Sequence, residues 1–145
     1  MRMMKRILIV ENEASMCKDL MMGFLALRDI DVDVVSDGNG GILQARQKEY
    51  DVLIADLCLP DMDGLEVIKK VKRSSPEIIP IIITGNGSIG NSLEAIRLEV
   101  SDYLEKPLSM ESVKNSIARG LEKRAQKRKA MRRDLKRILE RYANQ

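Results

Sequence analysis

Histidine and tryptophan are absent from this chain of 145 residues, which has one phenylalanine and two cysteines. Without histidine the chain cannot form a Ser/His/Asp or Cys/His catalytic group, a histidine-ligated metal site or a phosphohistidine of its own. Any phosphohistidine chemistry therefore requires a partner that carries it. Cys17 and Cys58 show no paired spacing, so the sequence predicts neither a zinc site nor a disulfide framework and suits a reducing compartment.

Long apolar runs are also lacking. The basic N-terminal residues 1–6 are followed by only four apolar residues, 7–10, before Glu11. That run is too short for a signal peptide or a membrane span. We therefore expect a cytoplasmic protein that makes no contact with a membrane.

Charge is distributed unevenly along the chain. The net charge is +3, but residues 119–141 alone carry +8, which leaves −5 for residues 1–118. The length suits one domain with an appendage. We expect a domain over residues 1–121 and a basic helical extension over residues 122–145.

Short β-branched runs alternate with helix-like segments. The strand-like runs are residues 7–10, 33–35, 52–55, 79–83 and 102–104, and the helix-like segments are residues 16–25, 42–46, 65–71 and 88–98. A last helix is expected after Ser109, a plausible N-cap, and runs to about Arg141. Five such alternations predict an α/β fold, with a parallel sheet covered by helices on both faces.

Polar residues stand directly after the apolar runs. Glu11, Asn12 and Glu13 follow the first run, Asp56 the third, Thr84 and Gly85 the fourth, and Lys106 and Pro107 the fifth. Because the carboxyl ends of parallel strands meet at one edge of a sheet, these residues are expected to share a pocket. Grouped carboxylates without His suit Mg²⁺, and a carboxylate, a Mg²⁺ site, a Lys and a Thr hydroxyl are what phosphoryl transfer to Asp requires. The nucleophile would be Asp56.

These motifs resemble the receiver domain of two-component response regulators, a flavodoxin-like phosphoacceptor domain. The resemblance rests on residues 7–13, on Asp56 with LPDMDG at residues 59–64, on Thr84-Gly85 and on residues 103–107, and it covers about residues 5–121. It implies a five-stranded sheet of order 2-1-3-4-5, an order for which a chemotaxis receiver is a known example. It also implies a histidine kinase or a histidine phosphotransfer protein as the phosphodonor.

The resemblance assigns roles residue by residue. Asp56 would be the phosphoryl acceptor, Lys106 would pair with the phosphoryl group, and Thr84 would hydrogen-bond to it. Tyr103 would change rotamer with Thr84 and alter the surface of the fourth helix, fifth strand and fifth helix. Glu11, Asn12, Asp56 and the backbone carbonyl of Cys58 would hold Mg²⁺, and the Lys106-Pro107 bond would be cis. No separate substrate is implied, so we do not expect an enzyme beyond self-phosphorylation from a phosphodonor and slow self-dephosphorylation.

One position departs from the pattern of the family. Two adjacent acidic residues are usual there, whereas this chain has Glu11 and Asn12. Asn offers a neutral carbonyl oxygen, so weaker Mg²⁺ binding is expected. Glu13 is a candidate to compensate for the lost carboxylate. Because Asn12 is expected to weaken the metal site, the alternative function is a phosphorylation-independent module for docking or dimerisation.

A rival motif lies at residues 85–90, which match GxGxxG and have Glu105 twenty residues beyond the first glycine. The motif would open the fourth helix rather than the first, and it leaves Asp56 and Lys106 without a role. A dinucleotide site is therefore not favoured, and the segment serves equally well as a switch loop.

The basic tail shows a spacing typical of a coiled-coil seam. Its members are Ile117, Leu121, Arg124, Arg128, Met131, Leu135, Ile138 and Tyr142. A solvated helix and a homodimer or signalling helix are the main alternatives, and nucleic-acid binding by this chain alone is not supported. The chain is either a stand-alone receiver or a fragment whose output module lies elsewhere.

Overall fold

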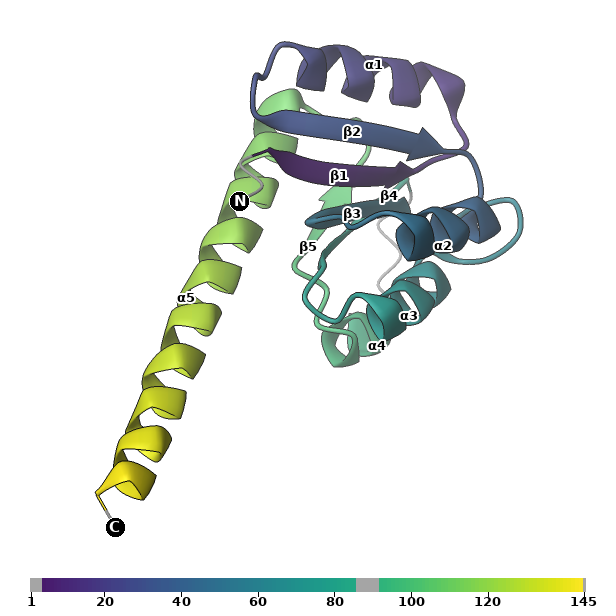
Figure 1. Ribbon diagram of the computed structural model, residues 1–145. Coiled ribbons are helices and arrows are strands. Elements are labelled where there is room, and N and C mark those ends of the chain that lie inside the picture. The colour runs from purple at the N-terminus through teal and green to yellow at the C-terminus, as the bar shows by residue number, and fades with distance from the viewer. Residues whose placement is uncertain (1–3, 86–91, 145) are drawn as a thin grey trace.

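The computed structural model describes residues 4–85 and 92–144 and shows a parallel five-stranded sheet between two layers of helices (Figure 1). The strands are β1 (Lys5–Val10), β2 (Ile30–Val35), β3 (Val52–Asp56), β4 (Ile79–Thr84) and β5 (Asp102–Glu105). The helices are α1 (Ala14–Leu25), α2 (Gly38–Gln47), α3 (Gly64–Ser74), α4 (Ser92–Arg97) and α5 (Met110–Ala143). The strand order is β2-β1-β3-β4-β5, which confirms the predicted α/β fold and order.

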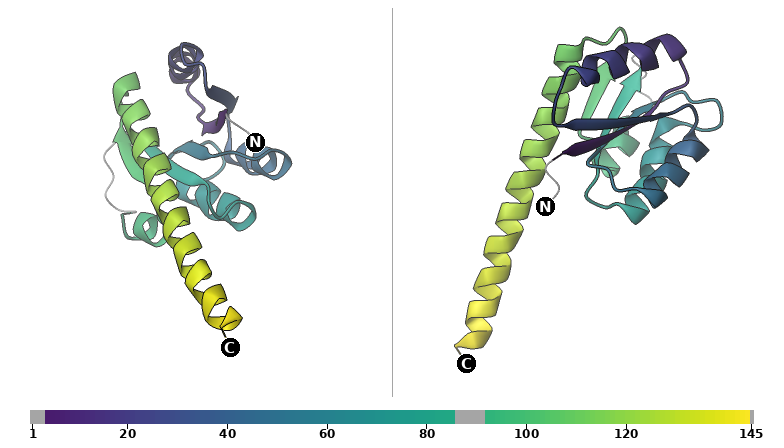
Figure 2. Two further views of the ribbon diagram at one scale, coloured as in Figure 1. Left: turned by 60° about the vertical axis from the view of Figure 1, so that its left-hand side comes forward. Right: turned by 45° about the horizontal axis from the view of Figure 1, so that its top comes forward.

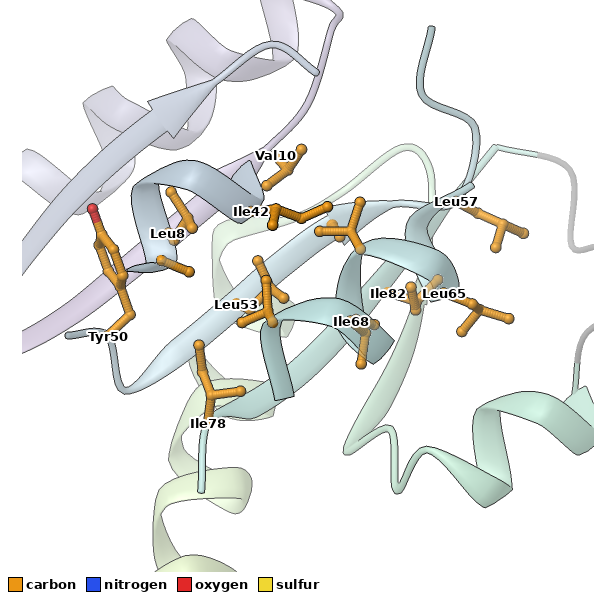
Figure 3. Packing of buried hydrophobic residues seen from close by; sticks show 14 of the residues in the cluster. Leu8, Val10, Ile42, Tyr50, Leu53, Leu57, Leu65, Ile68, Ile78 and Ile82 are labelled. Carbon is orange, nitrogen blue, oxygen red and sulfur yellow. The ribbon is translucent and has the colours of Figure 1, made fainter. Parts of the chain in front are cut away.

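The two faces of the sheet carry separate cores. In β3, Leu53 and Ala55 pack with α2, α3 and α4, whereas Val52 and Ile54 pack with α1 and α5, because successive strand residues point to opposite faces. All five residues of β3 are buried, as expected of a central parallel strand covered on both sides. Figure 3 shows the first core, in which Leu53 and Ile82 of the sheet lie against Ile68 of α3.

The register brings the strand ends together. Val10 of β1 is level with Ala55 of β3, Asp56 with Ile83 of β4, and Thr84 with Glu105 of β5. The residues that follow β1, β3, β4 and β5 therefore emerge at one edge of the sheet, which we call the carboxyl edge. The predicted grouping of these residues follows from this alignment.

Several elements differ in extent from their predictions; α2, for example, begins at Gly38 rather than Ile42. β2 begins at Ile30 rather than Asp33, and it is half-buried throughout because it lies at the edge of the sheet. The helix predicted over residues 88–98 is described only as α4, from Ser92 to Arg97. Residues 86–91, which hold most of the GxGxxG motif, lie outside the described residues.

The last helix, α5, begins on the body and continues well beyond it (Figures 1 and 2). Its N-cap is Ser109, as predicted, and the Ser109 hydroxyl accepts a hydrogen bond from the Ser112 amide at 3.1 Å. A Cβ on Gly120 would lie 2.5 Å from the Ile79 side chain, so glycine permits close packing of α5 on β4. Within residues 4–85 and 92–144, no helix is both long and apolar enough to cross a membrane.

Candidate phosphoacceptor site at the carboxyl edge

Asp56 is the last residue of β3 and is buried, with an exposed fraction of 6%. The strand pairing continues past it, because the Leu57 amide donates to the Ile83 carbonyl at 2.8 Å. One carboxylate oxygen, Oδ1, accepts from the Cys58 amide at 3.0 Å. The other oxygen, Oδ2, is thereby directed to a different partner.

The loop after Asp56 turns back on itself before α3. The Gly64 amide donates to the Leu57 carbonyl at 2.9 Å, and Cys58 forms an isolated bridge with Asp63. A Cβ on Gly64 would collide with the Asp56 carbonyl, so only glycine allows this close return. Cys58, whose carbonyl is a predicted metal ligand, is thus fixed two residues from the acid.

Lys106 supplies the second partner of Asp56. Its amide donates to the Thr84 carbonyl at 2.9 Å, which positions it beside the end of β4, and the Lys106-Pro107 bond is cis as the resemblance implied. Its Nζ lies 2.9 Å from Asp56 Oδ2 and 3.3 Å from Glu11 Oε1. Glu13 Oε2 also lies 3.3 Å from this nitrogen. One ammonium therefore faces three carboxylates.

This excess of acid perturbs the protonation of Glu11. Burial is the largest cause that raises the pKa of Glu11 to about 7; the neighbouring Asp56 carboxylate adds to the rise, whereas the Glu13 amide and the charge of Lys106 oppose it. The pKa of Lys106 is also raised: burial lowers it, but the hydrogen bond to Asp56 and the charge of Glu11 more than offset that effect. Near neutral pH Glu11 is therefore only partly ionised, at a site where three carboxyl groups face one ammonium.

The donor set fits a hard divalent cation. Glu11 is 1% exposed, and its Oε2 is buried with no hydrogen-bond partner among the described residues. A buried carboxylate oxygen without a partner is costly unless a cation or water satisfies it. No cluster of three Cys, Asp or Glu side chains in residues 4–85 and 92–144 is arranged to hold a metal by itself. Mg²⁺ suits such a site, since it typically uses one or two carboxylates and keeps several waters.

The remaining predicted residues are placed less closely. Thr84 is buried at the end of β4, and Asn12 is exposed directly after Glu11. Tyr103 lies half-buried on β5, and its hydroxyl is buried without a hydrogen-bond partner in the described part of the chain. The structure thus joins Asp56, Lys106, Glu11 and Glu13 by direct contacts and places Thr84 at the same edge.

One contact near the site had no signal in the sequence. The Asp61 carboxylate accepts from the Gly38 amide at 2.8 Å and from the Asn39 amide at 2.9 Å, so it caps the first turn of α2 from another loop. These backbone hydrogen bonds lower the pKa of Asp61. Only the juxtaposition of two distant loops reveals this residue as a brace for the loop that follows Asp56.

Comparison with known sequences points to one family. Residues 7–118 match the family model described as the response regulator receiver domain. The regulatory protein LuxO of Vibrio cholerae is 32% identical over 118 residues, which is 81% of this chain and 26% of that protein. The transcriptional regulatory protein ZraR of Salmonella typhimurium is 28% identical over 115 residues, 79% of this chain and 26% of that protein. The chain therefore spans about a quarter of the length of these curated relatives.

Solved structures agree on the fold. The REC domain of AraT, a response regulator from Geobacillus stearothermophilus, superposes with a TM-score of 0.76 at 31% identity and covers 87% of this chain and 99% of that one. A CheY-like receiver domain protein from Methanospirillum hungatei gives a TM-score of 0.79 at 23% identity, over 86% of this chain and 98% of that one. The second likeness supports the fold alone.

Proposed function

Since the chain belongs to the response regulator receiver domain family, we propose that it is a switch that accepts a phosphoryl group on Asp56 with the help of Mg²⁺. Receiver domains of two-component systems take this group from histidine kinases or phosphotransfer proteins. Because this chain has no histidine, a phosphohistidine donor must belong to another protein. The observation that carries the proposal is the 2.9 Å contact between Lys106 Nζ and the buried Asp56 carboxylate.

The chemistry assigned to Asp56 is an in-line transfer. One of its carboxylate oxygens forms a bond to phosphorus as the bond between phosphorus and the donor's imidazole nitrogen breaks, and the imidazole keeps that electron pair. Lys106 offsets the negative charge that gathers on the phosphoryl oxygens. Bound Mg²⁺ would supply the remaining charge neutralisation, held by Glu11, Asn12, Asp56 and the Cys58 carbonyl.

The switch proper is assigned to Thr84 and Tyr103. A phosphoryl group on Asp56 adds charge and strong acceptor oxygens at the end of β3, and the Thr84 hydroxyl at the end of β4 would donate to one of them. Tyr103 lies on the neighbouring strand β5 and would change rotamer in response. The output surface is then α4, β5 and α5, on which Leu93 and Ile96 of α4 are already exposed.

The extension is the second part of the proposal. We assign residues 1–121 to the receiver and residues 122–145 to a helical extension through which two copies form a homodimer. The exposed apolar side chains at the end of α5 support this role, among them Leu135 and Tyr142. The switch is proposed to act in the cytoplasm, a reducing compartment that suits the free thiols of Cys17 and Cys58.

Intact mass spectrometry tests the switch. Wild-type protein is incubated with acetyl phosphate with and without Mg²⁺, beside an Asp56→Asn variant. One added phosphoryl group is expected on the wild type with Mg²⁺, and none on the variant. Absence of the adduct from the wild type would refute the switch and leave the phosphorylation-independent docking module, which the neutral Asn12 would then explain.

A further inference from the structure

Three of the eight members of the seam read from the sequence of α5 already contact the body of the chain through a buried side chain or an ion pair. Ile117 is buried on the sheet. Arg124 pairs with Asp51 at 2.9 Å, and Arg128 pairs with Glu77 at 2.7 Å. The body of the chain therefore covers this side of α5 as far as residue 128.

A neighbouring seam on the same helix is more exposed, although its Leu121 packs partly against the core and its Arg128 is half-buried. It keeps four members of the first seam and moves the other four by one residue: Ala118, Leu121, Ala125, Arg128, Arg132, Leu135, Leu139 and Tyr142. The steps again alternate between three and four residues, the spacing of a helix-pairing seam. Ala118, Ala125 and Arg132 are exposed, as are Leu135, Leu139 and Tyr142. We call this set the open seam.

The far half of the open seam is hollowed. A shallow groove of about 400 Å³ is lined by Arg132, Leu135, Lys136, Leu139, Glu140 and Ala143. Leu135 and Leu139 are 55% and 59% exposed. Two leucines in a groove on a charged helix are suited to receive side chains from a second helix.

The order of small and large residues along the open seam identifies that second helix. Reversed about residue 130, the seam sets Ala118 opposite Tyr142, Leu121 opposite Leu139 and Ala125 opposite Leu135. Each alanine thus meets a large side chain, as close packing requires. A second copy running antiparallel supplies this complement by two-fold symmetry, whereas a parallel copy would set alanine against alanine.

The charges on the helix agree with this direction. In the antiparallel arrangement Glu122 flanks the seam beside Lys136 of the second copy, an attractive pair that occurs twice, and Lys129 lies beside Lys129 of the second copy, a repulsive pair that occurs once. A parallel arrangement would instead place Arg124 beside Lys129 of the second copy. Arg128 and Arg132 meet at the centre of the antiparallel pair, but Glu77 of the same chain already offsets the charge of Arg128 through two hydrogen bonds.

We propose that two copies of this chain pair antiparallel through the open seam of α5, centred near residue 130. This rests on the homodimer proposed above and specifies its contact face and its direction. The two receiver bodies would then lie near opposite ends of the helix pair.

Disulfide trapping tests the direction. In a background with Cys17→Ser and Cys58→Ser, an Ala125→Cys protein is mixed with a Leu135→Cys protein, the two are allowed to exchange, and they are then oxidised. The antiparallel pair predicts a cross-link between the two different variants and little within either alone. In a parallel pair, positions 125 and 135 would lie roughly 15 Å apart along the axis, too far for a disulfide, and each variant would link to itself. Gln126→Cys, turned by about 100° around the helix from Ala125 and away from the open seam, is the matched control and should not link to Leu135→Cys.

Sedimentation of the reduced proteins tests the homodimer separately from its antiparallel direction. Monomers at all concentrations would refute the homodimer itself. Dimers in which each variant links to itself, or in which Gln126→Cys links as well as Ala125→Cys, would keep the homodimer and overturn the antiparallel open seam. A second pair, Leu121→Cys with Leu139→Cys, repeats the test in case Leu135→Cys weakens association.

Discussion

A buried carboxylate lies beside a cationic side chain at both ends of the strands: at the carboxyl edge, and at the opposite end, which we call the amino edge. The positive and negative charges are balanced only at the amino edge. At the amino edge, one oxygen of Asp51 accepts from the Arg6 amide at 2.9 Å and the other from Arg124 at 2.9 Å. At the carboxyl edge, Lys106 is shared by three carboxylates, and Glu11 Oε2 has no partner among the described residues.

This difference separates a structural ion pair from one that suits the proposed phosphoryl transfer. A buried pair with all its hydrogen bonds made holds elements together and has no capacity for a ligand. A buried carboxylate with an unsatisfied oxygen is destabilising in the apo state, and it gains from any cation or positive group that enters. The amino edge thus anchors α5, and the carboxyl edge has the unpaired acid that the proposed Mg²⁺ and phosphoryl group would use.

The largest effect is expected from breaking the balanced edge. Asp51→Ala leaves the Arg124 guanidinium, which is 11% exposed, without its carboxylate. Loss of one partner of a buried pair costs about 3–5 kcal/mol, so the free energy of unfolding should fall by that amount in urea titrations. Glu77→Ala, which breaks the more exposed pair with Arg128, is the control and should cost less than about 1 kcal/mol. Equal losses would remove the distinction between buried anchor and surface pair.

The next largest effect is expected at the carboxyl edge, on the rate of phosphorylation. Lys106→Met keeps much of the apolar stem of the side chain but removes the ammonium 2.9 Å from Asp56. The rate of phosphorylation by acetyl phosphate should fall about 10²-fold, the usual result of losing one group that stabilises transition-state charge. Arg124→Met at the other edge should lower stability and leave the rate of the folded protein unchanged. A rate for Lys106→Met within twofold of the wild type would show that Lys106 has no part in the transfer.

The acid excess at the carboxyl edge predicts a pH dependence of stability. The folded-state pKa of Glu11 is about 7, above the ordinary 4.5, so the folded state binds a proton more tightly than the unfolded state. Stability from this group is therefore lost as the pH rises from about 4.5 to about 7. Glu11→Gln removes the titrating group. Without Mg²⁺, the free energy of unfolding of the variant relative to that of the wild type should therefore rise by on the order of 1–3 kcal/mol between pH 5 and pH 8. Thermal melts at the two pH values measure this, and parallel behaviour of the two proteins would contradict the raised pKa.

A smaller effect is expected from restoring the acidic pair. Asn12→Asp adds a second carboxylate beside Glu11, and Mg²⁺ affinity should rise about tenfold, or about 1.4 kcal/mol. Isothermal titration calorimetry compares this variant with Glu13→Gln. If Glu13 already compensates for Asn12, Glu13→Gln will weaken the binding of Mg²⁺ and Asn12→Asp will change it little.

The sequence predicted the parts of the molecule that depend on local pattern. The β-branched runs gave the central strands, and their shared ends gave the grouping of Asp56 with Lys106 and Glu11. The contacts of the α5 seam could not be predicted in the same way, because helical spacing identifies one face of a helix but not what packs against it. Only the fold shows that Asp51 and Glu77 of the same chain hold Arg124 and Arg128.

The central claim is that the unbalanced edge reacts and the balanced edge does not. Protein treated with acetyl phosphate and Mg²⁺ is reduced with borohydride, which converts an aspartyl phosphate to homoserine, and its peptides are sequenced by mass spectrometry. The account predicts homoserine at position 56 alone. Homoserine at position 51 or elsewhere, with Asp56 intact, would contradict it.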